Sequence, residues 1–194
     1  MIDQALYSLE QLNSLSNQPS YYQQEKHLNI RLRAIKDEAL SLGAQAGLAT
    51  ESNLINKFLI NYNSKLDSIF DFSQLLLNNN VLPPVISSTN NSLSVGRNSQ
   101  LIRVAGRSYK IISQVKFVTA PPTWRNYLYM NYLKPSLPNK VLLPSGEEAK
   151  KLWQKNIVKG WQKGMNQAVT IYKINLNRLV RDYTGMVLYE KTLN

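Results

Sequence analysis

A periodic row of apolar residues near the C-terminus predicts one long helix, and it constrains the fold more than any other feature. Its members recur at spacings of three and four residues: Trp153, Ile157, Trp161, Met165, Ala168, Tyr172, Leu176, Leu179 and Tyr183. These spacings return to the same face of an α-helix, so the row predicts an amphipathic helix. A helix over 146–183 would be roughly 55 Å long at about 1.5 Å per residue.

The start and the interior of this helix carry further signals. Ser145 and Glu148 have the spacing of a capping box, which predicts the start of the helix. We expect Gly160 and Gly164 to bend the helix and Gly185 to cap or kink it. The glycines of KGWQKG lie within the helical pattern and lack the Lys-Ser/Thr pair of a phosphate loop, so we expect no nucleotide site there.

Three segments in the N-terminal part show helical periodicity, at 2–16, 22–48 and 51–70. A patch of small residues lies near the junction of the last two and consists of Gly43, Ala44, Ala46, Gly47 and Ala49. Each glycine costs a helix interior about 1 kcal/mol relative to alanine. The patch therefore indicates either a break in the helix or a place where another backbone packs closely. The pattern leaves open whether 22–70 is one bent helix or two.

Asparagines and paired prolines shape the middle of the chain. Asn78–Asn80 tolerate left-handed turn geometry, and Val81–Leu82 must be extended because a proline follows. Residues 87–99 are polar and indicate a loop or the lead into a strand. The clearest strand pattern covers 100–119, where we expect a hairpin that turns at Ala105–Ser108.

These elements together predict a mixed α+β fold, with N-terminal helices, a small antiparallel β-sheet or hairpin in the middle, and a long C-terminal amphipathic helix. A short helical turn is expected around Trp124, after a second proline pair. We predict that 1–194 forms a single domain. Within it, 1–20 is expected to be a flexible N-terminal extension, and 131–144, which holds three prolines, an extended connector.

Composition argues against several classes of chemistry. The chain has no cysteine, which excludes disulfides, thiolate metal ligands and cysteine nucleophiles. His27 is the single histidine, so no multi-histidine metal site can form. No apolar run approaches the ~18 residues of a membrane-spanning helix, and residues 1–16 lack the pattern of a signal peptide. Most carboxylates fall at predicted helix surfaces or caps, so we expect no enzyme, no bound metal and no cofactor.

The charge of the chain is concentrated in its second half. Of the formal net charge of +11, residues 1–89 contribute −2 and residues 90–194 contribute +13. A surface this basic fits nucleic acid, an acidic membrane surface or an acidic protein.

Nucleic-acid binding is the main alternative function that these charges suggest. The predicted basic positions are Lys150, Lys151, Lys155, Lys159 and Lys163 on the long helix and Arg97, Arg103, Arg107, Lys110 and Lys116 around the hairpin. Aromatic residues that stack on bases are available at Trp124, Tyr127 and Tyr129. The preferred interpretation is a solvated lysine face with tyrosines in the core, because the aromatic residues of the helix fall on its apolar face, away from the lysines.

Several longer segments resemble the DotC family, a component of type IVB (Dot/Icm-like) secretion systems that is related to TraI of conjugative plasmids. The segments are ALSLGAQAGLA (39–49), LDSIFDFSQLLLNNNVLPPVI (66–86), YKIISQVKFVTAPPTWRNYL (109–128), LLPSGEEAKKLWQKNIVKGWQKGMNQA (142–168) and LVRDYTGMVLY (179–189). They cover most of 35–190 in the same order, which makes the resemblance more specific than any short motif.

The resemblance implies a periplasmic scaffold subunit of the outer-membrane core complex, held at the outer membrane by a lipidated N-terminal cysteine that this sequence does not contain. It implies DotD-like and DotH-like subunits as partners, and no catalytic residues. As a hypothesis, the contact surface includes Pro83, Pro84, Trp124, Arg125 and Tyr127, with the 131–144 segment lying on a neighbour because prolines reduce the ordering cost of binding. The alternative is that Trp124 is buried in its own fold.

Overall fold

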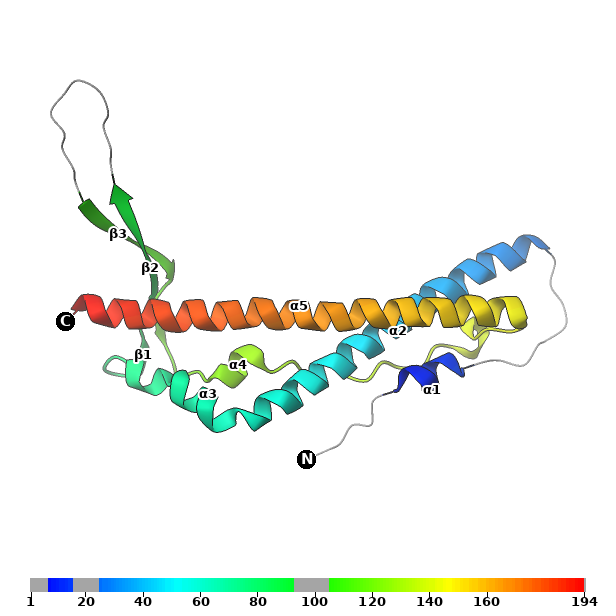
Figure 1. Cartoon of the computed structure of the whole chain (residues 1–194), viewed down its shortest axis with the longest axis horizontal. Coiled ribbons are helices and arrows are strands. Elements are labelled where there is room, and N and C mark those ends of the chain that lie inside the picture. Colours follow the sequence, from blue (N-terminus) through cyan, green and yellow to red (C-terminus); the bar gives the residue numbers. More distant parts are fainter. Residues whose placement is uncertain (1–6, 16–24, 93–104, 194) are drawn as a thin grey trace, which may run out of the picture. The chain divides into compact units, whose positions relative to one another are not determined.

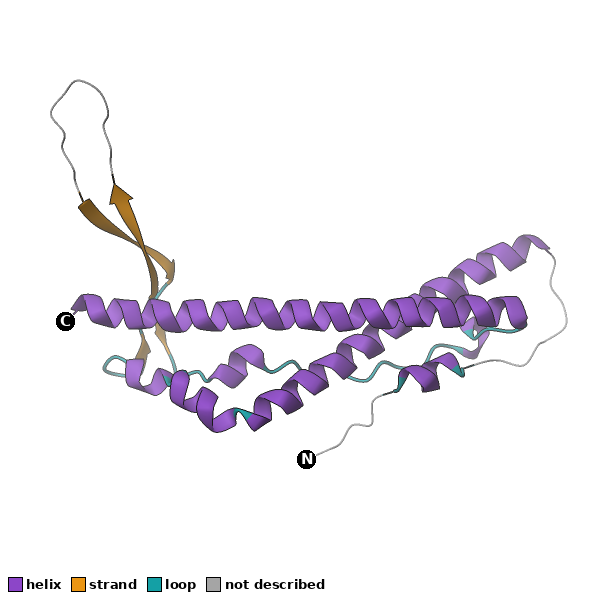
Figure 2. Ribbon diagram, in the orientation of Figure 1, coloured by secondary structure: helices purple, strands orange, loops and turns teal. Residues whose placement is uncertain are grey.

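The computed structural model describes residues 7–15, 25–92 and 105–193, and these residues form two compact units (Figure 1). Unit 1 contains the chain up to Asn61 together with 129–174. Unit 2 contains 62–128 together with the chain from Asn175 onward. Helices dominate both units, and two small antiparallel sheets lie in unit 2 (Figure 2). The predicted α+β class, with its long C-terminal helix, is confirmed.

Unit 1 is built from two short and two long helical elements. These are α1 (Leu9–Asn13), α2 (Glu25–Asn61), the 3-10 helix η2 (Lys140–Leu142) and the part of α5 (Glu147–Leu193) that ends at Ile174. Their shared core is made of apolar residues that are almost fully buried, namely Leu12, Ile35, Ala39, Leu42, Ala46, Ala149, Trp153 and Ile157. Although 1–20 was predicted as a flexible extension, its described helix α1 therefore contributes Leu12 to this core.

The small-residue patch of α2 is a close helix–helix contact and not a helix break. A Cβ on Gly43 would overlap the carbonyl oxygen of Ile157, and a Cβ on Gly47 would overlap that of Trp161. The glycines of α5 are as close to α2, because a Cβ on Gly160 or Gly164 would overlap the carbonyl oxygen of Leu40 or Ala44. Two glycine pairs, each spaced four residues apart, thus let the backbones of α2 and α5 touch, a geometry that permits Cα–H···O contacts. The expected bend at Gly160 and Gly164 is replaced by this packing.

Unit 2 combines α3 (Asn63–Ile69), the 3-10 helix η1 (Phe72–Leu75), α4 (Trp124–Leu128) and the end of α5 with four strands. The strand β1 (Val81–Leu82) pairs with β4 (Lys116–Phe117), and β2 (Val85–Ser92) pairs with β3 (Ala105–Ser113), both antiparallel. Before β1, Asn79 and Asn80 adopt φ values of 63° and 56°. The predicted left-handed turn and the extended Val81–Leu82 are confirmed.

The predicted hairpin turn at Ala105–Ser108 is wrong. These residues begin β3 and are already paired with β2, since Ala105 pairs with Ser92 and Ser108 with Thr89 in an antiparallel ladder. The partner strand β2 consists mostly of Ser, Thr and Asn, so it shows no apolar alternation and was read as a loop or the lead into a strand. Most of the segment predicted as the first strand of that hairpin, together with Arg97 and Arg103, lies outside the described residues.

Two predicted helix boundaries also differ from the structure. The helix α5 begins at Glu147, and Gly146 before it has φ +84°, while the Ser145 hydroxyl accepts a hydrogen bond from Arg31. The capping box with Glu148 would place the start one residue earlier. At the other end, Gly185 neither caps nor kinks α5, which continues to Leu193. A Cβ on Gly185 would collide with Val85 and Ile86 of β2, so this glycine lets the helix approach the strand.

The structure gives boundaries for the three predicted N-terminal helices within the described residues. The helix α2 is continuous through the glycine patch, and it ends at Asn61. Tyr62 separates it from α3 and has non-helical backbone angles, with φ −106° and ψ 13°. The segment 22–70 is thus two helices whose junction lies at Tyr62, well beyond the small-residue patch. Of the first predicted helix, Leu9–Asn13 is helical, and residues 1–6 lie outside the description.

Candidate partner-binding site around Trp124

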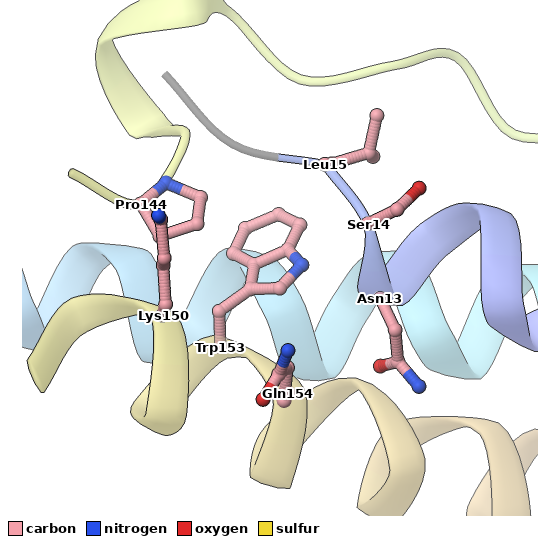
Figure 3. Close-up of a pocket in the computed structure, with 7 residues that line it drawn as sticks. All are labelled: Asn13, Ser14, Leu15, Pro144, Lys150, Trp153 and Gln154. Atoms are coloured by element: carbon pink, nitrogen blue, oxygen red, sulfur yellow. The ribbon is translucent and has the colours of Figure 1, made fainter. Parts of the chain in front are cut away.

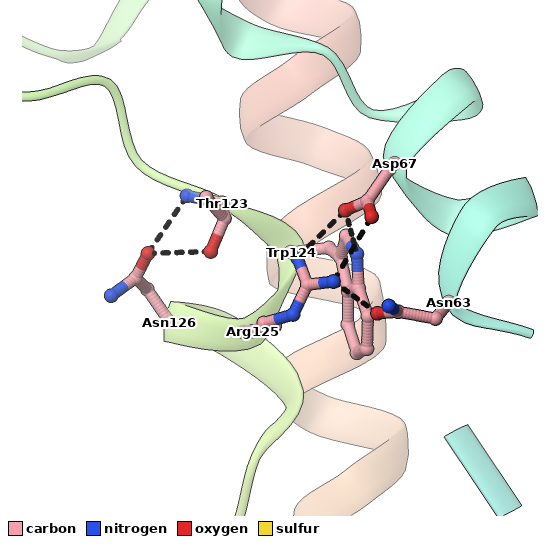
Figure 4. Close-up of polar contacts among 6 residues, drawn as sticks. All are labelled: Asn63, Asp67, Thr123, Trp124, Arg125 and Asn126. Carbon is pink, nitrogen blue, oxygen red and sulfur yellow. Dashed lines mark hydrogen bonds and ion pairs between the residues drawn. The ribbon is translucent and has the colours of Figure 1, made fainter. Parts of the chain in front are cut away.

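The short helix α4 places Trp124 in the interior of unit 2. Asn126 caps the start of the helix, because its Oδ1 atom accepts hydrogen bonds from the backbone N–H of Thr123 at 2.7 Å and from its hydroxyl at 3.0 Å (Figure 4). The Trp124 side chain is fully buried. Its indole N–H donates to Oδ1 of Asp67 on α3 at 2.8 Å, which satisfies the single polar atom of the ring.

Asp67 also binds the neighbouring arginine with both of its oxygens. The Nη1 and Nη2 atoms of Arg125 lie 2.7 and 3.0 Å from Oδ1 and Oδ2 of Asp67, and Nη2 also donates to Oδ1 of Asn63 (Figure 4). The guanidinium carbon lies 4.5 Å from the Trp124 ring centre, a cation–π contact. Hydrogen bonds from Arg125 and then from Trp124 lower the pKa of Asp67. The carboxylate thus joins α3 to α4.

Tyr127 forms a second polar and aromatic cluster on the same helix. Its hydroxyl donates to Oδ2 of Asp182 on α5 at 3.3 Å, and its ring stacks on Phe72 with centres 5.8 Å apart. Arg178 places its guanidinium 5.2 Å from the Tyr127 ring centre. Burial, and then the negative charge of Asp182, raise the pKa of Tyr127 to about 12. The cluster is completed by Tyr183, which meets Phe72 edge to face at 5.2 Å.

The five residues predicted as a contact surface are all buried or half-buried, and they contact other residues of unit 2. Pro83, Pro84 and Trp124 are buried, and Arg125 and Tyr127 are half-buried and engaged by other side chains of the unit. This arrangement favours the alternative that Trp124 is buried in its own fold.

Sequence reasoning missed the two carboxylates of this site, Asp67 and Asp182. One signal was available, because an arginine that packs beside a core tryptophan is commonly paired with a carboxylate, and the segment around Arg125 contains none. The sequence does not say which of the distant carboxylates takes that role.

A small pocket lies in unit 1 between the end of α1 and the start of α5. Figure 3 shows its lining residues, which are Asn13, Ser14, Leu15, Pro144, Lys150, Trp153 and Gln154. Its volume of about 160 Å³ is below the roughly 300–1,000 Å³ typical of small-molecule sites. The Trp153 indole N–H beside it donates to the Leu12 carbonyl oxygen at 3.0 Å. The pocket is therefore smaller than a typical substrate site, and it has room for several water molecules.

The described residues, 7–15, 25–92 and 105–193, lack the features of a metal site and of a membrane-spanning helix. Within these ranges, no three His, Asp or Glu side chains gather in a way that would hold a metal ion. Within the same ranges, no helix combines the length and the hydropathy needed to cross a bilayer.

The exposed surface of unit 1 carries a row of lysines on α5. Lys151, Lys155, Lys159 and Lys163 recur every four residues, and all four are exposed. Like charges four residues apart on a helix repel one another and cost about 0.2–0.5 kcal/mol per pair. The predicted lysine face is thus present. The aromatic residues Trp153 and Trp161 lie apart from it, buried and half-buried in the unit 1 core.

Large apolar side chains are also exposed in both units. In unit 1 they include Leu133, Leu137 and Val141 of the proline-rich segment, which are 72%, 49% and 67% exposed. In unit 2 they gather on β3, β4 and the residues between them, namely Tyr109, Ile111, Ile112, Val115 and Phe117. Clusters of exposed apolar side chains are typical of protein–protein contact sites.

Comparison with known protein families finds a model that matches most of the chain. The model is T4SS_TraI, described as "Type IV secretory system, conjugal DNA-protein transfer", and it matches residues 29–194. A search of the curated proteins finds no matching relative. The matched range includes nearly all of α2 and every later element of both units.

Proposed function

Because this chain belongs to the T4SS_TraI family of type IV secretory systems, we propose that it is a structural subunit of the DotC type. In this role it acts by binding other subunits of a type IVB outer-membrane core complex and catalyses no reaction. Its partners are DotD-like and DotH-like subunits, and it works in the periplasm at the outer membrane. The resemblance of its longer segments to DotC supports this finer assignment.

One observation carries the proposal, namely how the proline-rich segment 131–144 lies on unit 1. Pro135 and Pro144 are buried, and the ammonium group of Lys134 lies 3.7 Å from the Tyr7 ring centre. These contacts hold the segment in place, while Leu133 and Val141 stay mostly exposed. An extended segment that is fixed at intervals presents apolar side chains to a neighbour at a low entropic cost.

Co-purification with candidate subunits tests this role. The full chain carries an affinity tag and is expressed with DotH-like and DotD-like subunits of the same secretion system, and the bound subunits are identified after capture. We expect both subunits to be retained. The double change Leu133→Ser and Val141→Ser should reduce their recovery, because it removes exposed apolar area while leaving the buried prolines in place.

A matched control separates loss of contact from loss of fold. Ile30 on α2 and Ile174 on α5 are 72% and 61% exposed, so the double change Ile30→Ser and Ile174→Ser removes a similar exposed apolar surface elsewhere in unit 1. We expect this variant to capture both subunits normally. Circular dichroism checks that every variant keeps its helix content. Failure of the unaltered chain to retain either subunit would contradict the proposed function.

A second candidate function is nucleic-acid binding, which the lysine row of α5 favours. Its four ammonium groups are exposed, and no carboxylate occurs between Glu148 and Asp182. Four phosphate contacts predict a steep loss of affinity with salt, with a slope in log–log form of about −3 to −4. Binding of labelled duplex DNA at several salt concentrations measures this slope. A chain that captures partner subunits and shows no salt-dependent DNA binding supports the first function over the second.

A further inference from the structure

The β2–β3 ribbon of unit 2 exposes apolar side chains on both of its faces. Tyr109 and Ile111 share one face of β3, and Ile112 lies on the other, because successive residues of a strand point to opposite sides. Their exposed fractions are 47%, 53% and 41%. Two-stranded ribbons are marginally stable in water when nothing packs on them. The ribbon thus has apolar surface available for a partner on either side of the strand.

Among the described residues, no strand other than β2 pairs with β3. The strand belongs to a two-stranded sheet, in which it pairs with β2 from Ala105 to Ser113. It is nine residues long and contains no proline, so each residue has an N–H and a C=O group, and alternate residues direct both groups away from β2. A long, open edge with apolar side chains is a template for pairing with another strand. Backbone hydrogen bonds are therefore available to an incoming extended segment.

The charge of the ribbon decides what kind of strand fits there. Arg107 and Lys110 on β3 are exposed, and so is Lys116 on β4. No Asp or Glu occurs anywhere from Phe72 to Gly146. Pairing of this edge with a second copy of itself would bring arginine and lysine side chains together, which is unfavourable. A segment with carboxylates is the complementary occupant.

We propose that the outer edge of β3 binds an extended segment of an acidic protein partner, which adds a third strand to the ribbon. The backbone of the segment pairs with β3, its carboxylates face Arg107 and Lys110, and its apolar side chains pack on Tyr109 and Ile111. This inference rests on the proposed function, since it names the chemistry of one contact that the subunit makes within its complex.

Synthetic peptides test the proposal on the full chain. Arg107 and Lys110 lie on opposite faces of β3, so the probe is a fluorescent peptide in which glutamate occupies every third position between valines, which places carboxylates on both faces of the added strand. Its reference is the same peptide with lysine in place of glutamate. Fluorescence anisotropy measures binding. Hydrogen–deuterium exchange then reports the backbone amides of β3. We expect the glutamate peptide alone to bind, and we expect it to slow exchange at β3, because side-chain docking without strand addition leaves the open-edge amides unprotected.

A charge reversal provides the decisive control. The double change Arg107→Glu and Lys110→Glu alters two exposed residues, so the fold is kept and circular dichroism verifies this. We expect it to weaken binding of the glutamate peptide by about tenfold or more. The lysine peptide should bind this variant in its place. Recovery of binding with the opposite charge shows that the edge is intact and that charge selects the strand.

Four outcomes with the isolated chain overturn the inference. With the peptides, these are equal binding of the glutamate and lysine peptides, and binding that leaves exchange at β3 unchanged. The other two are concentration-dependent self-association of the chain that the charge reversal abolishes, and β3-dependent binding to phosphatidylglycerol vesicles in place of the glutamate peptide. Failure here is distinguishable from failure of the proposed function. If the charge-reversed chain still retains its partner subunits as well as the unaltered chain does, the subunit role stands and the acidic-strand inference falls.

Discussion

Gly164 of α5 lies so close to α2 that a Cβ at this position would overlap the carbonyl oxygen of Ala44. The nearest neighbours of this Cβ would all be backbone atoms, and they include the backbone nitrogen of Leu48. Backbone atoms cannot rotate away as a side chain can, so a larger residue would have to separate the two helices. The contact therefore sets the distance between α2 and α5 in unit 1.

Gly164→Ala is predicted to destabilise the protein even though it improves helix propensity. Alanine gains about 1 kcal/mol over glycine in a helix interior, whereas overpacking costs about 1–3 kcal/mol or more. Because the overlapping atoms belong to the backbone, we take the upper end of that cost and expect a net loss of about 2 kcal/mol in the free energy of unfolding, measured by urea titration. The control is Gln167→Ala on the exposed side of the same helix, which should change stability little. An increase in stability for Gly164→Ala would show that the helices are not in contact there.

Acid is predicted to weaken the link between α3 and α4. The folded state lowers the pKa of Asp67, so its ionised form stabilises the fold above the unfolded pKa of about 3.9, and this contribution is lost as the pH falls through the folded pKa. At neutral pH, Asp67→Asn should lower the urea midpoint, because Arg125 loses its charged partner. The difference between this variant and the unaltered chain should shrink below about pH 4. A difference that is constant from pH 7 to pH 3 would contradict the assignment.

Alkaline pH is predicted to act through Tyr127. Its folded-state pKa of about 12 exceeds the unfolded value of 10.0, so the contribution is fully present below pH 10 and is lost as the pH rises towards 12. Tyr127→Phe removes the hydroxyl and its 3.3 Å bond to Asp182. We expect a cost near 0.5 kcal/mol at pH 7, the low end for a hydrogen bond, and a shallower loss of stability between pH 10 and 12. Tyr132→Phe, at an exposed position, is the control and should keep the steeper loss.

The elements that sequence reasoning predicted well are those whose signal is local. The apolar row from Trp153 to Tyr183 predicted α5, because helical spacing alone places it on one face. Asn79 and Asn80 predicted a left-handed turn from the properties of one residue type. The strand β2 was missed since its polar residues pair with β3 through the backbone, and backbone pairing leaves no trace in side-chain periodicity.

The candidate site shows the same division between local and distant information. That Trp124 begins a short helix follows from the prolines before it, but its buried position beside Asp67 depends on α3, which is distant in the sequence. Asp67 lies 58 residues from Arg125, and no local pattern connects them. The glycine pairs of α2 and α5 were visible as a small-residue patch and as two helix glycines, yet their mutual contact required the register of the two helices.

Trp153 is predicted to hold α1 against unit 1. Its ring is fully buried, and its indole N–H donates to the carbonyl oxygen of Leu12 at 3.0 Å. Trp153→Phe removes the donor and leaves a buried carbonyl unpaired, which costs about 1–3 kcal/mol. We expect the amides of Leu9–Asn13 to exchange with deuterium faster in this variant, while those of β2 and β3 are unchanged. Trp161→Phe, a change at a half-buried ring on the same helix, should leave α1 as protected as before. Equal protection of α1 in all three proteins would mean that the indole bond does not hold it.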